Sequence, residues 1–209
     1  MTTAGKLISV NVGELREIER DGELVLTGIW KHPVERRVAV QGVNLAGDDQ
    51  ADRTVHGGVE KAVYSYAIED YEWWREQHSG DFLPGTFGEN LTLRGVDVTA
   101  AVLGEFWQIG STLLEVNEPR FPCWKLGVRM DDPKFLKRFS QALRPGAYLR
   151  IVEPGEIGAG DDVKIVDRPD HGVTISLFNR AYLQDHTLAA NVLEAPSLGS
   201  GWREWFAQR

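Results

Sequence analysis

The only cysteine of the chain stands among residues that favour thiolate chemistry. Cys123 follows Pro122, a residue common in the first turn of a helix, so we expect the thiol close to a helix N-terminus. The outward backbone N–H groups there, with Arg120 and Lys125 nearby in sequence, would stabilise a thiolate. A thiolate acts as a nucleophile or as a soft metal ligand. The alternative is a buried cysteine that behaves as a small hydrophobic residue, and the local sequence leaves both interpretations open.

A histidine followed by two glycines is the second candidate, within residues 52–61. Gly57 and Gly58 would let the backbone approach a ligand closely, and their N–H groups suit an anion. His56 can donate a hydrogen bond or transfer a proton. Taken alone, however, this pattern is more often an ordinary polar turn between strands.

Two further segments carry polar groups that suit ligand binding. In residues 84–91, Glu89 offers an acceptor and Asn90 an amide that together can read the edge of a heterocycle, although a capped turn with solvent-facing side chains is the commoner outcome. Residues 146–155 indicate a strand and a turn, and Arg150 is the residue there that suits contact with an anion.

Short strands must position these segments. Phe106-Trp107-Gln108-Ile109 and residues 112–116 flank Gly110-Ser111, a pattern typical of a hairpin with a two-residue turn. Short strands at this spacing indicate a mainly β fold, an antiparallel barrel or sandwich rather than a parallel α/β sheet. Further strands are expected at residues 6–12, 38–40, 42–45, 148–152 and 162–166.

Helices flank the predicted strands in two places and follow them at the C-terminus. Residues 68–77 have apolar positions at helical spacing, and Asp132-Pro133 is a good start for a helix over 134–143. After Pro169 the pattern changes to three short helices at residues 177–183, 188–193 and 202–206. We therefore predict a barrel domain over residues 1–170 and a helical extension over 171–209 that packs on it.

Composition excludes several classes of function. The 209 residues carry a formal net charge of −8, which argues against nucleic-acid binding. One cysteine cannot form an internal disulfide, a four-cysteine zinc site or an iron–sulfur cluster. The sequence contains no apolar run long enough for a transmembrane helix and no secretory signal pattern, so we expect a cytoplasmic protein that makes no membrane contact. Dinucleotide-binding, P-loop and zinc-protease motifs are also missing from the sequence.

Taken together, the four segments resemble the MOSC domain, the fold named after the C-terminal part of molybdenum cofactor sulfurase. Residues 52–63, 85–90, 119–126 and 148–155 follow the order and approximate spacing of that family's motifs. The tail, with residues 177–180 and 201–205, resembles the three-helix extension of the bacterial 6-hydroxylaminopurine-resistance subgroup. The resemblance covers nearly the whole chain.

The resemblance implies a β-barrel that binds the pterin-based molybdenum cofactor, with Cys123 as the ligand to the metal. It also implies reduction of small N-hydroxylated compounds, including hydroxylaminopurine-type base analogues, with His56, Glu89 or Asn90 orienting the substrate or supplying a proton. Cationic side chains and glycine N–H groups suit the phosphate of the cofactor. The candidates for contact with the cofactor are Arg53, His56, Gly57, Gly58, Lys61, Arg120, Lys125 and Arg150.

The sequence departs from larger family members in two respects. The sulfurase carries a pyridoxal-phosphate domain upstream, which the short segment before residue 52 cannot supply, so pyridoxal phosphate is not expected. A single cysteine cannot hold an iron–sulfur cluster, so we expect the electrons to come from a separate donor protein.

The first alternative to a reductase is a non-catalytic carrier or binding module for the cofactor or its sulfur. The second is metal-free thiol chemistry with His56 as base. A homodimer is compatible with either alternative.

Overall fold

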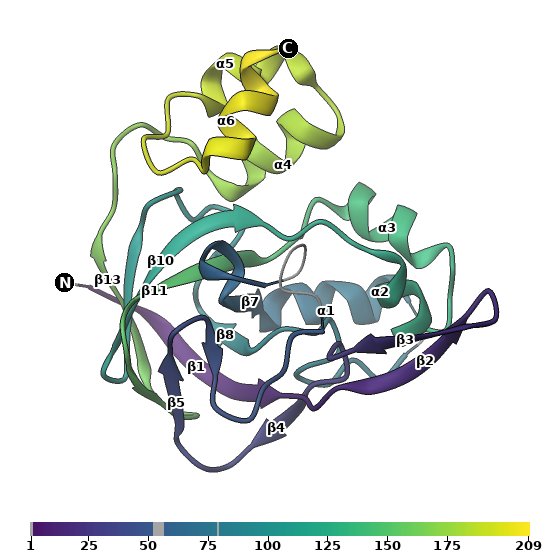
Figure 1. Ribbon diagram of the computed structural model, residues 1–209. Coiled ribbons are helices and arrows are strands. Elements are labelled where there is room, and N and C mark those ends of the chain that lie inside the picture. The colour runs from purple at the N-terminus through teal and green to yellow at the C-terminus, as the bar shows by residue number, and fades with distance from the viewer. Residues whose placement is uncertain (1, 52–56, 79) are drawn as a thin grey trace.

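A closed β-barrel forms the centre of the computed structural model, which describes residues 2–51, 57–78 and 80–209 (Figure 1). Within these residues, one sheet runs in the order β13-β9-β10-β11-β7-β8-β1-β4, and a further pairing of β13 with β1 closes it. The prediction of a mainly β barrel with flanking helices is confirmed. The strands are β1 (Thr2–Val12), β4 (His32–Val34), β7 (Val63–Ala67), β8 (Leu91–Arg94), β9 (Phe106–Ile109), β10 (Thr112–Pro119), β11 (Ala147–Glu153) and β13 (Asp162–Asp167).

Neighbouring strands of the barrel are antiparallel except β7 and β8, which pair in parallel. A parallel pair needs a crossover, and helix α1 (Ile68–Gln77) provides it at the bounds that its spacing predicts. The expected β9–β10 hairpin is also present, and Gly110 adopts a φ of 55° in its turn. β10 then runs on to Pro119, which brings the chain directly to Arg120 and Cys123.

Smaller sheets lie beside the barrel. One joins β12 (Gly155–Ile157), β5 (Val38–Gln41) and β6 (Asn44–Leu45). Another is a hairpin of β2 (Arg16–Arg20) and β3 (Glu23–Thr27), which extends outward past helix α2 (Trp124–Arg129) in Figure 1. The sequence did not predict this hairpin because most of its side chains are exposed, so no face alternates clearly between apolar and polar.

An aromatic cluster separate from the barrel core packs α1 against α2 and α3 (Phe135–Ala142). Trp74 and Phe139 stack with ring planes 4° apart, and Phe87 packs against both. The cluster includes Tyr64 and Tyr66 of β7, so these rings hold the helices against one wall of the barrel. That wall carries the segment around Cys123.

The chain after the barrel forms α4 (Ile175–Leu183), α5 (Ala189–Val192) and α6 (Ser200–Ala207), gathered at one end of the molecule in Figure 1. Short 3-10 turns occupy Val59–Lys61 and His186–Leu188. Phe178 of α4 and Phe206 of α6 belong to the same buried core as the barrel strands, and α4 contacts β10. The boundary at residues 170 and 171 stays a prediction. No helix in the described ranges has both the length and the apolar character needed to cross a membrane.

Candidate functional site

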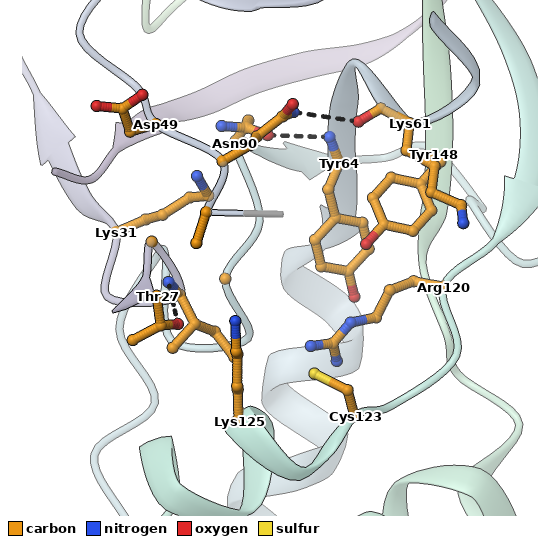
Figure 2. A pocket seen from close by; sticks show the side chains of 15 residues that line it. Thr27, Lys31, Asp49, Lys61, Tyr64, Asn90, Arg120, Cys123, Lys125 and Tyr148 are labelled. Carbon is orange, nitrogen blue, oxygen red and sulfur yellow. Dashed lines mark hydrogen bonds between the residues drawn. The ribbon is translucent and has the colours of Figure 1, made fainter. Parts of the chain in front are cut away.

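A pocket opens beside the start of α2 and is lined by residues from six separate parts of the chain (Figure 2). The space in it open to water-sized groups is about 90 Å³. The lining residues are Thr27, Gly28, Ile29, Lys31, Asp49, Gln50, Ala51, Lys61, Tyr64, Gly88, Asn90, Arg120, Cys123, Lys125 and Tyr148.

Cys123 caps the N-terminus of α2, so its expected position close to a helix start is confirmed, although Pro122 precedes the cap and lies outside the first turn. Its backbone is extended, with φ −112° and ψ 166°, and its carbonyl accepts a hydrogen bond from the N–H of Leu126 at 2.9 Å. The side chain is partly exposed and lines the pocket. The thiol is therefore accessible from the pocket, unlike that of a core cysteine.

Arg120 places a buried cation next to that thiol. The residue is 5% exposed, and its guanidinium lies 5.4 Å from the ring centre of Tyr64 and 5.3 Å from that of Phe139. Burial lowers the pKa of Arg120, but interactions with Tyr64, Tyr148 and Cys123 outweigh it and raise the pKa overall. Nη1 has no hydrogen-bond partner among the described residues. A buried donor left in this state favours an anionic ligand.

Tyr64 and Tyr148 form the wall beside Arg120, and the sequence predicted neither as a site residue. They are cross-strand partners on β7 and β11, with ring centres 5.3 Å apart. Burial raises the pKa of Tyr148 to about 12, against a lowering effect of Arg120. Burial also raises the pKa of Tyr64 well above its usual value. Both phenols therefore keep their protons near neutral pH and remain hydrogen-bond donors.

Lys31 and Asn90 lie across the pocket from Arg120 in Figure 2 and share the buried carboxylate of Asp48. The ammonium of Lys31 hydrogen-bonds to Asp48 Oδ1, and Asn90 Nδ2 donates to Oδ2 at 3.0 Å. Asn90 Oδ1 accepts from the N–H of Tyr64 at 3.0 Å. Burial lowers the pKa of Lys31, although Asp48 acts in the opposite direction. Asn90 thus lines the pocket while both ends of its amide hold neighbouring segments together.

Glu89 lies behind the pocket wall and not on it. It is fully buried, and its Oε1 accepts hydrogen bonds from Gly85 N at 2.7 Å, from Thr92 Oγ1 at 2.8 Å and from the Tyr71 hydroxyl. Burial raises the pKa of Glu89, and these hydrogen bonds oppose the rise. In this geometry the carboxyl group organises the 85–92 turn.

Of the remaining candidates, Lys125 and Lys61 line the pocket and Arg150 does not. Lys125 lines the pocket, and its Nζ donates to the carbonyl of Leu26 at 2.9 Å, which ties α2 to the β2–β3 hairpin. Lys61 also lines it, and its ammonium lies 3.4 Å from Glu118 Oε1. Arg150 is held outside the pocket by Glu60 at 2.6 Å and by Glu115 at 3.3 Å.

The His-Gly-Gly segment is described only in part. Gly57 borders a second cavity, and Gly58, with a φ of 83°, precedes the 3-10 turn that carries Lys61. Arg53 and His56 lie outside the described residues.

Sequence reasoning missed Lys31, Asp48, Tyr64 and Tyr148. Lys31 and Asp48 are 17 positions apart, and Asp48 and Asn90 are 42 apart, so no local pattern joins them. Tyr64 lies in a strand that the sequence did not predict, and Tyr148 lies in a strand from which Arg150 alone was singled out. A lysine between Trp30 and His32 offered the one usable hint, because a charged residue in an aromatic segment often has a buried partner.

The comparison with family models matches residues 52–164 to the MOSC domain, which is more than half of the chain. The chain belongs to the MOSC domain family. The matched range contains the partly described 52–61 segment, the 85–90 turn and the Cys123 loop. It begins and ends within the barrel, so the helices of the extension lie outside it.

Similar proteins agree with this assignment. The uncharacterized protein YflK of Bacillus subtilis (strain 168) is 31% identical over 206 residues, covering 97% of this chain and 93% of the relative. A protein named reductase from Gibberella moniliformis is 32% identical over 79% of this chain, which spans 30% of that longer protein. The crystal structure of YiiM from Geobacillus stearothermophilus has a TM-score of 0.81 and 29% identity, and covers 98% of each chain. This MOSC protein therefore shares its whole architecture, extension included, with YiiM.

The MOSC family implies a molybdenum cofactor, and the pocket's residues fit one. Its dithiolene and phosphate groups are anionic, and the pocket presents Arg120 beside Cys123, with no partner for Nη1 in the described part of the chain. Lys125 adds positive charge, whereas the charge of Lys31 is balanced by Asp48. No group of three or more His, Cys, Asp or Glu side chains within the described ranges could hold a metal ion. A single thiolate suits a metal that arrives with its own ligands.

Proposed function

We propose that this MOSC protein binds the molybdenum cofactor through Cys123 and uses it to reduce small N-hydroxylated compounds. The observation that carries the proposal is the pairing of a pocket-facing thiol with a buried guanidinium that has no carboxylate partner among the residues that the structure describes. Such a cation is costly to bury unless a ligand supplies the compensating negative charge. The kinship with a protein named reductase supports a redox role.

Each pocket residue has a physical role in this proposal. Arg120 neutralises anionic groups next to the Cys123 thiolate, and Lys125 adds a second positive charge at the mouth. The phenol of Tyr148 keeps its proton and orients an acceptor atom of the ligand or substrate, whereas the hydroxyl of Tyr64 donates to Pro145 O at 2.8 Å and fixes that ring in the wall. The buried Lys31–Asp48–Asn90 network fixes the opposite wall. When bound, the cofactor supplies the two-electron chemistry.

The overall reaction balances as an N-hydroxyl group, two electrons and two protons giving the N–H compound and water. The electrons come from a separate donor protein, since the chain has a single cysteine and no dinucleotide-binding motif. We keep His56 as the candidate proton donor from the sequence.

Purification of the protein from a cofactor-proficient host and from a cofactor-deficient host tests whether it binds the molybdenum cofactor. We expect molybdenum in the first preparation and not in the second, measured by mass spectrometry. The carrier alternative predicts bound molybdenum without turnover. Assay of the loaded protein with 6-hydroxylaminopurine and a low-potential reductant separates the two, because only an enzyme converts the substrate.

A further inference from the structure

The hairpin of β2 and β3 carries leucines and glutamates together on one of its two faces. The strands pair so that Glu17 lies opposite Leu26 and Glu19 opposite Leu24. Side chains alternate between the faces of a hairpin, and residues directly opposite each other share a face. These four residues therefore form one face, which we call the leucine–glutamate face. In Figure 1 the hairpin projects outward past α2.

The leucine–glutamate face is open to solvent. Leu24 is 69% exposed and Leu26 is 47% exposed, and both glutamates are exposed as well. Neither leucine belongs to the barrel core or to the aromatic cluster formed by the described residues. Single exposed apolar residues are common on protein surfaces, but two that stand side by side within a polar rim are typical of an interaction site.

The opposite face of the hairpin carries its arginines and is held against the barrel and α2. The guanidinium of Arg16 lies 3.2 Å from the centre of the Trp30 ring, and that of Arg20 lies 4.5 Å from the centre of the Trp124 ring. Because the arginines share the other face, the leucine–glutamate face presents negative charge only. The chain as a whole is also acidic, with a formal net charge of −8.

The hairpin leads directly into the Cys123 pocket. β3 ends at Thr27, which lines the pocket. The carbonyl of Leu26 accepts a hydrogen bond at 2.9 Å from Lys125 Nζ, and Lys125 lines the pocket as well. A protein seated on the leucine–glutamate face would therefore lie beside the pocket that the proposed reaction uses.

We propose that the leucine–glutamate face is the docking surface for the electron-donor protein, and that the donor presents an apolar patch edged by lysine or arginine. The proposal rests on the proposed function, which takes two electrons per turnover from a separate protein. Complementary charge at the rim speeds the encounter and fixes its register. The face is small, and electron-transfer encounters have interface areas at the low end of the range.

Docking itself changes no covalent bond. In each turnover the donor protein is oxidised by two electrons and the substrate is reduced by them. The N–O bond of the substrate breaks, and two protons, taken ultimately from water, complete the N–H compound and the water that leaves.

A second copy of this chain fits the leucine–glutamate face less well than a basic partner does. A two-fold symmetric dimer brings the same patch of each copy together. The carboxylates of Glu17 and Glu19 in one copy would then meet those of the other, and like charges placed opposite each other are destabilising.

Turnover of the molybdenum-loaded full chain with two electron sources tests the proposal, with 6-hydroxylaminopurine as substrate. Reduced methyl viologen is a small reductant that needs no docking surface. Dialysed soluble extract of the source cells, supplied with NADH and NADPH, provides the protein donor. Leu24→Ser should lower the extract-supported rate at least fivefold and leave the viologen-supported rate unchanged. Val152→Ser, at a 43% exposed position on β11, is the matched control and should change neither rate.

Ionic strength gives a separate readout of the charges. The extract-supported rate of the wild-type protein should fall as salt is added, because salt screens exposed charges. The double variant Glu17→Gln, Glu19→Gln should start several-fold lower and respond less to salt.

Two results would overturn the docking proposal alone while viologen-supported turnover is normal. One is an equal extract-supported rate in wild type and Leu24→Ser, and the other is an extract that cannot drive the wild-type protein. A wild-type dimer in sedimentation that Leu24→Ser dissociates would assign the face to a second copy and would also overturn it. Absence of turnover with viologen contradicts the proposed function, and the docking proposal then falls with it.

Discussion

The guanidinium of Arg120 lies 5.4 Å from the centre of the Tyr64 ring, and one of its nitrogens has no hydrogen-bond partner among the described residues. Burial of this cation is costly, and its interactions with Tyr64, Tyr148 and Cys123, which raise its pKa, offset that cost. Its position beside Cys123 leaves Nη1 suited to an anion that enters the pocket. We therefore assign Arg120 to ligand binding rather than to the stability of the fold.

Replacement of Arg120 by methionine should therefore separate stability from binding. The thioether keeps contact with Tyr64 and Phe139 and removes the buried charge, so we expect the free energy of unfolding to stay equal or rise. Molybdenum content should fall at least tenfold, and Arg120→Lys should retain an intermediate amount. Urea denaturation and metal analysis measure the two effects. A strongly destabilised variant that keeps its metal would show that Arg120 serves the fold.

Glu89 gives a pH-dependent prediction. Its hydrogen bonds from Tyr71, Gly85 and Thr92 all end on Oε1, and its buried Oε2 has no partner in the described part of the chain, so Glu89→Gln can keep these bonds while removing the charge. Burial raises the folded-state pKa of this carboxyl above its usual value of 4.5. As the pH rises past 4.5, the unfolded chain therefore loses the proton first and the wild-type protein loses stability.

The stability advantage of Glu89→Gln over wild type should accordingly grow from pH 4.5 upward and level off above the raised pKa. Urea titrations at a series of pH values measure it. A constant difference across the series would contradict the assignment. Retention of substrate reduction by this variant would remove Glu89 as a proton donor.

Lys125 should act on the ligand more than on the fold. Its side chain lines the pocket, and its ammonium donates a hydrogen bond to Leu26 O. We expect Lys125→Met to lower cofactor retention several-fold, with a loss of about 1 kcal/mol or less in stability. Lys137→Met, on α3 outside the pocket lining, is the matched control and should change neither quantity. The same losses in both variants would indicate an effect of net charge alone.

Phe121 tests the predicted division into residues 1–170 and 171–209. Its ring lies 4.5 Å from Tyr182 and 5.4 Å from Trp202, at the junction of the barrel and the helices. Phe121→Ala should cost about 3 kcal/mol, the usual range for removal of a packed ring. Because Phe178 and Phe206 share one core with the barrel, we expect a single unfolding transition in the wild-type protein. Urea denaturation monitored with separate probes for the barrel and the helices measures this. Two unfolding transitions would indicate that the extension unfolds independently.

Local signals predicted the elements whose determinants are local. The turn at Gly110, the α1 helix and the cap at Cys123 each depend on a few adjacent residues, and all three are present. β7 was missed because all five of its side chains are buried, so its sequence does not alternate. The hairpin of β2 and β3 was missed for the opposite reason, since nearly all its residues are exposed.

The site residues also divide into those that are adjacent in the chain and those that only the fold brings together. Arg120, Cys123 and Lys125 were found together because they are adjacent in the chain and remain together in the fold. Lys31, Asp48 and Asn90 come from three distant segments, which only the closure of the barrel brings into contact. Glu89 looked like an acceptor for a ligand, but burial turned its carboxyl toward the turn that it stabilises.

Molybdenum analysis of wild-type protein and Cys123→Ser, both purified from a cofactor-proficient host, tests the central claim most directly. Serine keeps the size and the cap position but lacks the thiolate, so the fold should persist and circular dichroism should match. We predict close to one molybdenum per wild-type chain and a loss of at least tenfold in the variant. Equal metal content in the two proteins, or none in folded wild type, would contradict Cys123 as the metal ligand.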